Sequence, residues 1–136
     1  MVSKKQLLDV RAGIDELAAH GSILIGGSHP VNGKNAPEGK GYFVAPTVIV
    51  ANDADTAIFH EKEVFGPVTT LLPYDGSVES AIDYIARGEG CLVSSIYSND
   101  RKWLKEALLK AAVWNGRLFV AVSYTHLRAH ETVDYL

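Results

Sequence analysis

The sequence predicts an α/β fold in which a mainly parallel sheet carries helices on both faces. Short runs of β-branched and other apolar residues alternate along the chain with longer segments whose apolar residues recur at helical spacing. Parallel strands need crossover connections, and helices that serve as these connections also cover the sheet. With 136 residues, 47% of them hydrophobic and 21% charged, the chain is long enough for one domain with a core.

The first predicted elements are a helix and two strands. Residues 3–19 carry apolar side chains at helical spacing, and this helix is expected to end near His20. Residues 22–25 are an apolar run that predicts a short buried strand. A loop rich in glycine, proline and asparagine follows over residues 26–40, and residues 47–50 predict the next strand. We expect this loop to be a hairpin-like excursion rather than a linker.

The middle of the chain predicts a helical turn, a strand and a capped helix. The turn is expected over residues 55–59, and the β-branched run at residues 68–72 predicts the strand. Ser77 is expected to cap the next helix, with Ser80 as its partner in place of the more usual glutamate. That helix is predicted to stop at Gly88.

The last predicted elements complete the alternation of strand and helix. Residues 92–97 predict a strand, and a helix is expected to open at Asn99-Asp100 and run through Trp114. The pair Asn115-Gly116 predicts a turn, and residues 117–120 predict a final strand.

Composition excludes several classes of partner. The net charge is -3 without long runs of one sign, which gives no electrostatic reason to expect nucleic acid or an anionic membrane surface. The single cysteine excludes an intramolecular disulfide. The sequence holds neither a signal-peptide pattern nor an apolar stretch long enough to span a bilayer, so we expect a cytoplasmic protein.

The candidate binding site is the pair Glu63 and Phe65. A carboxylate can accept hydrogen bonds from both hydroxyls of a ribose, while an aromatic face packs on a neighbouring ring. Their i, i+2 spacing in an extended segment points both side chains to the same side, as one ligand in contact with both requires. Gly66 lets the backbone turn closely beneath them, and Pro67 fixes the entry to the following strand. The alternative is a solvated charge beside a core phenylalanine.

The Glu-x-Phe-Gly-Pro element and the segments around it resemble the C-terminal part of the catalytic domain of aldehyde dehydrogenases. The resemblance covers roughly residues 3–120, and its elements occur in the family's order. They are Gly41-Tyr42-Phe43, Pro46-Thr47, Glu63 to Pro67, Pro73-Tyr74, the strand at 92–97 and Trp114-Asn115-Gly116-Arg117. Residues 1–120 are therefore expected to be a partial catalytic domain.

The resemblance implies a role for each residue of the pair. Glu63 would bind the nicotinamide ribose of NAD or NADP, and Phe65 would limit how the nicotinamide ring sits. The cysteine nucleophile, the general-base glutamate and the oxyanion-binding amide lie upstream in the family, so this chain is expected to hold no catalytic residue and to be inactive alone. The parent enzyme would oxidise a small-molecule aldehyde to the acid and would form a homo-oligomer. The choice between NAD and NADP stays open.

Other candidate residues receive structural interpretations. Cys91 follows the Glu63 element, whereas the family's nucleophile precedes it, so Cys91 is expected to be a small buried hydrophobe. His60 is expected to be an exposed loop histidine without a role. The glycines at 26–27 and 39–41 lack the strand-to-helix context of a phosphate loop.

Within the family, four segments look most like the ring-cleavage proteins of phenylacetate catabolism. They are Val2 to Gln6, Phe59-His60-Glu61, Gly88-Glu89-Gly90 and Asn115-Gly116-Arg117. This likeness implies a CoA-linked semialdehyde as substrate, NADP as coenzyme and a fused hydratase-like domain in the parent protein. The alternatives are an ordinary NAD-dependent aldehyde dehydrogenase and a small non-catalytic α/β module that binds a partner.

The tail over residues 121–136 is expected to be non-native. Val122 to Thr132 resembles the conceptual translation of a transposase-type sequencing-library adapter, and the preceding strand pattern stops abruptly before it. The i, i+4 spacing of His126 and His130 would otherwise suggest half of a metal site. Because the segment is expected to be artefactual, both histidines are excluded as metal ligands, and no metal site is predicted. The start also looks internal, because the first helix arrives without a preceding strand.

Overall fold

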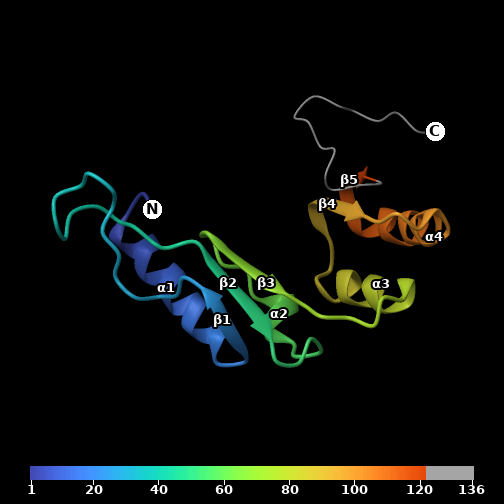
Figure 1. Cartoon of the computed structure of the whole chain (residues 1–136), viewed down its shortest axis with the longest axis horizontal. Coiled ribbons are helices and arrows are strands. Elements are labelled where there is room, and N and C mark those ends of the chain that lie inside the picture. The colour runs from blue at the N-terminus through green and yellow to red at the C-terminus, as the bar shows by residue number, and fades with distance from the viewer. Residues whose placement is uncertain (122–136) are drawn as a thin grey trace. The chain divides into compact units, whose positions relative to one another are not determined.

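The computed structural model describes residues 1–121, which form two compact units (Figure 1). The first unit is Met1–Tyr74, and the second begins at Asp75. Apart from Ala121, the predicted non-native tail lies outside the described residues.

The first unit contains two helices and three strands. They are α1 (Lys4–Ala18), β1 (Gly21–Ile25), β2 (Thr47–Ala51), α2 (Ile58–Glu61) and β3 (Val68–Leu71). Helix α1 begins after Ser3, whose hydroxyl accepts a hydrogen bond from the backbone N–H of Gln6 at 3.1 Å. This cap satisfies one of the unpaired donors at the helix start.

The three strands form one sheet in the order β1-β2-β3. Strands β2 and β3 are parallel, with Thr47 opposite Val68, as the sequence predicts. Strands β1 and β2 are antiparallel, because the intervening loop returns the chain as a hairpin. The predicted hairpin-like excursion is confirmed, and the parallel arrangement holds only for the β2–β3 pair of this sheet.

The core of the first unit lies between α1 and β2. Val10 and Ile14 of the helix and Ile49 of the strand are at most 2% exposed. Thr47 is equally buried, and its hydroxyl is satisfied there because it accepts a hydrogen bond from Gly27 N and donates one to Ala45 O, both at 3.0 Å. Helix α1 is therefore held on the sheet by a well-packed apolar face.

The second unit holds the remaining helices and strands. They are α3 (Val78–Arg87), β4 (Cys91–Tyr97), α4 (Arg101–Ala111), the 3₁₀ turn η1 (Ala112–Trp114) and β5 (Asn115–Ala121). Strands β4 and β5 pair in parallel, with Cys91 opposite Asn115. The parallel pairs and the helices that alternate with them confirm the α/β class.

One predicted turn in the second unit is wrong. Asn115 and Gly116 open β5 instead of forming a turn, and the chain reverses earlier, in the 3₁₀ turn that follows Ala111. Gly116 lies so close to β4 that a Cβ atom there would be 3.0 Å from Leu92 O. Pairing with β4 thus overrides the local turn preference of an Asn-Gly pair.

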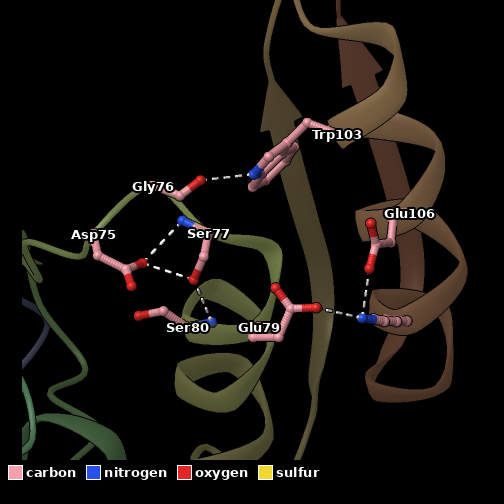
Figure 2. A network of polar contacts seen from close by, with 8 residues as sticks. Asp75, Gly76, Ser77, Glu79, Ser80, Trp103 and Glu106 are labelled. Carbon is pink, nitrogen blue, oxygen red and sulfur yellow. Dashed lines mark hydrogen bonds and ion pairs between the residues drawn. The ribbon is translucent and has the colours of Figure 1, made fainter.

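A polar network joins α3 to α4 in the second unit (Figure 2). The Ser77 hydroxyl accepts from Ser80 N at 3.1 Å, which confirms the predicted cap. The Trp103 indole donates to Gly76 O at 2.8 Å. The Lys110 ammonium lies 2.9 Å from a Glu79 oxygen and 2.7 Å from a Glu106 oxygen, so one cation bridges both helices.

Several strand residues leave large apolar side chains in contact with solvent. In β1, the exposed fractions are 43% for Ile23, 59% for Leu24 and 62% for Ile25. In β4, Leu92 is 86% exposed. In the part of the chain that the structure describes, both strands are also edge strands, so they present unpaired backbone groups beside exposed apolar surface. Within residues 1–121, no helix combines the length and apolarity needed to cross a membrane.

Candidate functional site

The segment from Lys62 to Pro67 links α2 to β3 and carries both predicted site residues. Lys62 ends α2 in an extended conformation, with φ -91° and ψ 113°. The segment then runs through bends at residues 65–67 into β3, so an extended backbone is observed at Lys62 and does not continue to Phe65.

Alternate residues of this segment contact α1. The Lys62 ammonium pairs with the Glu16 carboxylate at 2.5 Å. Val64 lies against Gly13, where a Cβ atom would come within 2.7 Å of Val64 Cγ2. Gly66 lies against Val10, where a Cβ atom on the glycine would come within 2.5 Å of Val10 Cγ1.

These three contacts follow one helix face. Glu16, Gly13 and Val10 are spaced three residues apart, so they lie near one another on the surface of α1. Residues of the segment separated by two therefore face the helix, and the residues between them face away from it.

Glu63 and Phe65 are the two residues that face away. Both side chains are exposed, Phe65 to 74%. Among residues 1–121, the Glu63 carboxylate makes no hydrogen bond and no ion pair. The alternative interpretation of Phe65 as a core residue is wrong, because its ring lies outside the core of the first unit. An unpaired acid and an uncovered ring two residues apart are free to meet one ligand.

Backbone hydrogen bonds hold the exit of the segment. Gly66 N donates to Val64 O at 2.7 Å, and Val68 N donates to Gly66 O at 2.8 Å. These bonds between residues two apart close two tight turns in succession. Thr47 N donates to Pro67 O at 2.8 Å, which fastens the segment to β2. The structural role expected of Pro67 fits this position.

The geometry matches a ligand that carries a diol beside a flat ring. The free carboxylate can accept two hydroxyl hydrogen bonds, and the exposed phenylalanine ring can pack against an aromatic or nicotinamide ring. For comparison, residues 1–121 contain no group of three His, Cys, Asp or Glu side chains arranged to hold a metal ion. The assignment of Glu63 and Phe65 to a coenzyme stays a prediction.

Cys91 and His60 do not lie where the sequence suggested. Cys91 is exposed instead of buried, because it opens β4 and no element within residues 1–121 covers it, and its thiol donates to Asn115 Oδ1 at 2.8 Å. His60 lies in α2, half-buried, with Nε2 2.7 Å from Ala54 O, so it is not an exposed loop residue.

Sequence reasoning missed the part of α1 that supports the site. Gly13 in a helix interior costs about 1 kcal/mol relative to alanine, and such a glycine usually has a packing reason. A glycine inside the predicted helix was therefore the one sign in the sequence that another segment packs against position 13. The sequence does not say which segment that is. The partner, Val64, is 51 positions away in the sequence, since 64 − 13 = 51.

Comparisons with known proteins find similar sequences over most of this chain. The profile of the aldehyde dehydrogenase family matches residues 1–116. The 3,4-dehydroadipyl-CoA semialdehyde dehydrogenase of Aromatoleum evansii is 33% identical over 121 residues, which cover 88% of this chain and 23% of that protein.

Solved structures are similar as well. An aldehyde dehydrogenase from Bacillus cereus has a TM-score of 0.69 at 29% identity, over 88% of this chain and 22% of that one. A 1-pyrroline-5-carboxylate dehydrogenase from Thermus with bound NAD has a TM-score of 0.70 at 25% identity, over 88% and 21%. The chain thus spans about a fifth to a quarter of the length of each of these proteins.

Proposed function

Since this chain belongs to the aldehyde dehydrogenase family, we propose that it is the coenzyme-facing part of a longer enzyme that oxidises an aldehyde to a carboxylic acid with NAD or NADP. We call that longer protein the parent enzyme. The observation that carries the proposal is the exposed Glu63 carboxylate, which has no partner within residues 1–121, beside the exposed Phe65 ring. A matched protein of known structure binds NAD, which supports the same class of coenzyme here.

In this proposal Glu63 accepts hydrogen bonds from the two hydroxyls of the nicotinamide ribose. A charged acceptor makes stronger hydrogen bonds than a neutral one, so the carboxylate fixes the ribose more firmly than an amide would. Phe65 lies against the nicotinamide ring and limits the orientations the ring can take. When bound, the coenzyme supplies the acceptor for the hydride that leaves the substrate carbon.

The remaining chemistry is assigned to the parent enzyme outside this chain. Oxidation to the acid requires a cysteine nucleophile, a general base and donors for the oxyanion. We propose that these groups precede residue 1 in the parent enzyme and that the chain alone is inactive. Cys91 is not assigned to the nucleophile, since its thiol is hydrogen-bonded to Asn115 at the start of β4.

For the substrate we propose a CoA-linked semialdehyde. The support is the 33% identity with the A. evansii protein, whose name states that activity, together with the likeness to phenylacetate ring-cleavage proteins. The competing proposal is a generic aldehyde dehydrogenase. Comparing kcat/KM for a CoA-linked semialdehyde with that for the free semialdehyde distinguishes them: a preference below about tenfold would favour the generic enzyme.

The coenzyme role is tested by Glu63→Gln in the parent enzyme, with Glu61→Gln as the matched control. Glu61 is also exposed and lies two residues away, at the end of α2. Loss of a charge-assisted hydrogen bond costs about 1.5–3 kcal/mol, so we expect the coenzyme KM to rise roughly ten- to a hundredfold in the first variant only. Unchanged coenzyme kinetics in Glu63→Gln would remove the assigned role.

A further inference from the structure

We propose that Gly13 and Val10 of α1 are positioning residues for coenzyme binding, because they set where the Glu63–Phe65 segment stands. The proposal rests on the proposed coenzyme role of Glu63 and Phe65. Neither helix residue faces the ligand side of the segment, and both act through a residue that neighbours the pair: Gly13 through Val64, and Val10 through Gly66.

The contact at Gly13 leaves no free space. A Cβ atom added there would lie 2.7 Å from Val64 Cγ2 and 3.2 Å from Val64 Cγ1. Carbon atoms in contact normally stand about 3.5–4.0 Å apart, so a methyl group at position 13 must push Val64 away by roughly 1 Å. At the second contact the glycine belongs to the segment and the valine to α1. A methyl group on Gly66 would stand 2.5 Å from Val10 Cγ1.

Helix α1 is the rigid partner in both contacts. Ile14 and Leu17 are 0% and 4% exposed and anchor the helix in the core. The segment is the partner that must yield, because residues 62–67 belong to no helix or strand and their exit is held to β2 by the bond from Thr47 N to Pro67 O. The ion pair between Lys62 and Glu16 cannot substitute for the packing, since its side chains are 36% and 50% exposed and such pairs contribute little.

Displacement of Val64 therefore carries the site with it. Val64 stands directly between Glu63 and Phe65, so its backbone cannot shift without moving both neighbours. Misplacement of a binding group by about 1 Å can reduce catalysis by about a hundredfold. Gly13 thus determines the position of Glu63 and Phe65, because only a residue without a side chain lets Val64 pack this closely on α1.

The test uses Gly13→Ala and the compensating double variant Gly13→Ala/Val64→Ala in the parent enzyme. We expect Gly13→Ala to raise the coenzyme KM about tenfold or more and to leave the aldehyde KM within about twofold. The double variant removes the obstructing methyl groups, so it is expected to restore the coenzyme KM although its melting temperature falls through the loss of Val64 atoms that pack on α1. Ala12→Gly, at an exposed position of the same helix, controls for helix propensity.

The decoupling of coenzyme KM from melting temperature distinguishes positioning from general stability. If the coenzyme KM of Gly13→Ala stays normal while Glu63→Gln raises it, the positioning role is overturned and the coenzyme role stands. If the double variant does not restore the coenzyme KM, and the coenzyme KM of the variants instead rises as their melting temperature falls, the positioning role is likewise overturned. If Glu63→Gln leaves the coenzyme KM unchanged, the proposed coenzyme role of Glu63 fails and this inference fails with it.

Discussion

Val64 occupies the space that a side chain at Gly13 would need, with Val64 Cγ2 only 2.7 Å from where a Cβ atom on the glycine would stand. This contact turns Val64 toward α1 and, by alternation, turns Glu63 and Phe65 toward solvent. Gly13 lowers the intrinsic stability of the helix, but it lets Val64 pack closely on α1. That packing determines where the two residues assigned to the coenzyme lie.

The core of the first unit depends on Ile14. This side chain is fully buried, so Ile14→Ala removes packed atoms and leaves a cavity that costs about 2–5 kcal/mol. Leu8 lies on the same helix but is 53% exposed, so Leu8→Ala should cost less than about 1 kcal/mol. Urea unfolding of the chain, followed by circular dichroism, measures both. Equal losses for the two variants would show that α1 does not pack as described.

The second unit should lose stability in acid. The Ser77 hydroxyl and backbone N–H donate to Asp75 and lower the pKa of that carboxyl below its ordinary 3.8. The Lys110 ammonium donates to Glu79 and lowers its pKa below 4.5. A carboxyl whose pKa is lower in the folded state stabilises the fold above its unfolded pKa, and this contribution disappears as the pH falls through the folded value.

The melting temperature as a function of pH measures this effect. We expect a plateau above about pH 6 and a decline through about pH 4. Glu79→Gln should flatten the decline, whereas Glu89→Gln should leave it unchanged, because the Glu89 carboxylate makes no ion pair within residues 1–121. A decline as steep in Glu79→Gln as in the wild type would argue against the Lys110 contact.

The exposed edge strand β1 predicts self-association of the isolated chain. Ile23, Leu24 and Ile25 together present apolar side chains beside an unpaired strand edge, a combination that promotes edge-to-edge pairing. We expect the chain to form oligomers by size-exclusion chromatography with light scattering and to bind a hydrophobic dye. Leu24→Lys should reduce both signals by placing a charge on the edge. A monodisperse wild-type monomer that unfolds cooperatively would instead favour the small self-contained binding module.

Local signals in the sequence predicted the starts of α1, α3 and α4 well, whereas α2 begins at Ile58 instead of residue 55. Ser3 and Ser77 cap helices through their own hydroxyls, and the Asp100 carboxylate accepts from Lys102 N and Trp103 N at the start of α4. Each of these caps involves residues at most three positions apart, so the chain specifies them without help from the rest of the fold.

The failures are nonlocal in origin. The Asn115-Gly116 pair favours a turn locally, but pairing with β4 places it in strand β5. Cys91 begins an apolar run, yet its burial depends on a covering element that the described residues do not supply. At the candidate site, the spacing of Glu63 and Phe65 was visible in the sequence, whereas their support by α1 depends on a contact between distant segments.

The most direct test of the central claim pairs a change in the protein with a change in the ligand. Coenzyme affinity of the parent enzyme is measured by titration for wild type and Glu63→Gln, each with the natural coenzyme and with an analogue whose nicotinamide ribose lacks one hydroxyl. If Glu63 accepts a hydrogen bond from that ribose, removal of the hydroxyl weakens binding to the wild type by about tenfold and to Glu63→Gln much less, a coupling of about 1–3 kcal/mol. Equal losses in both proteins would contradict the assignment of Glu63 to the nicotinamide ribose.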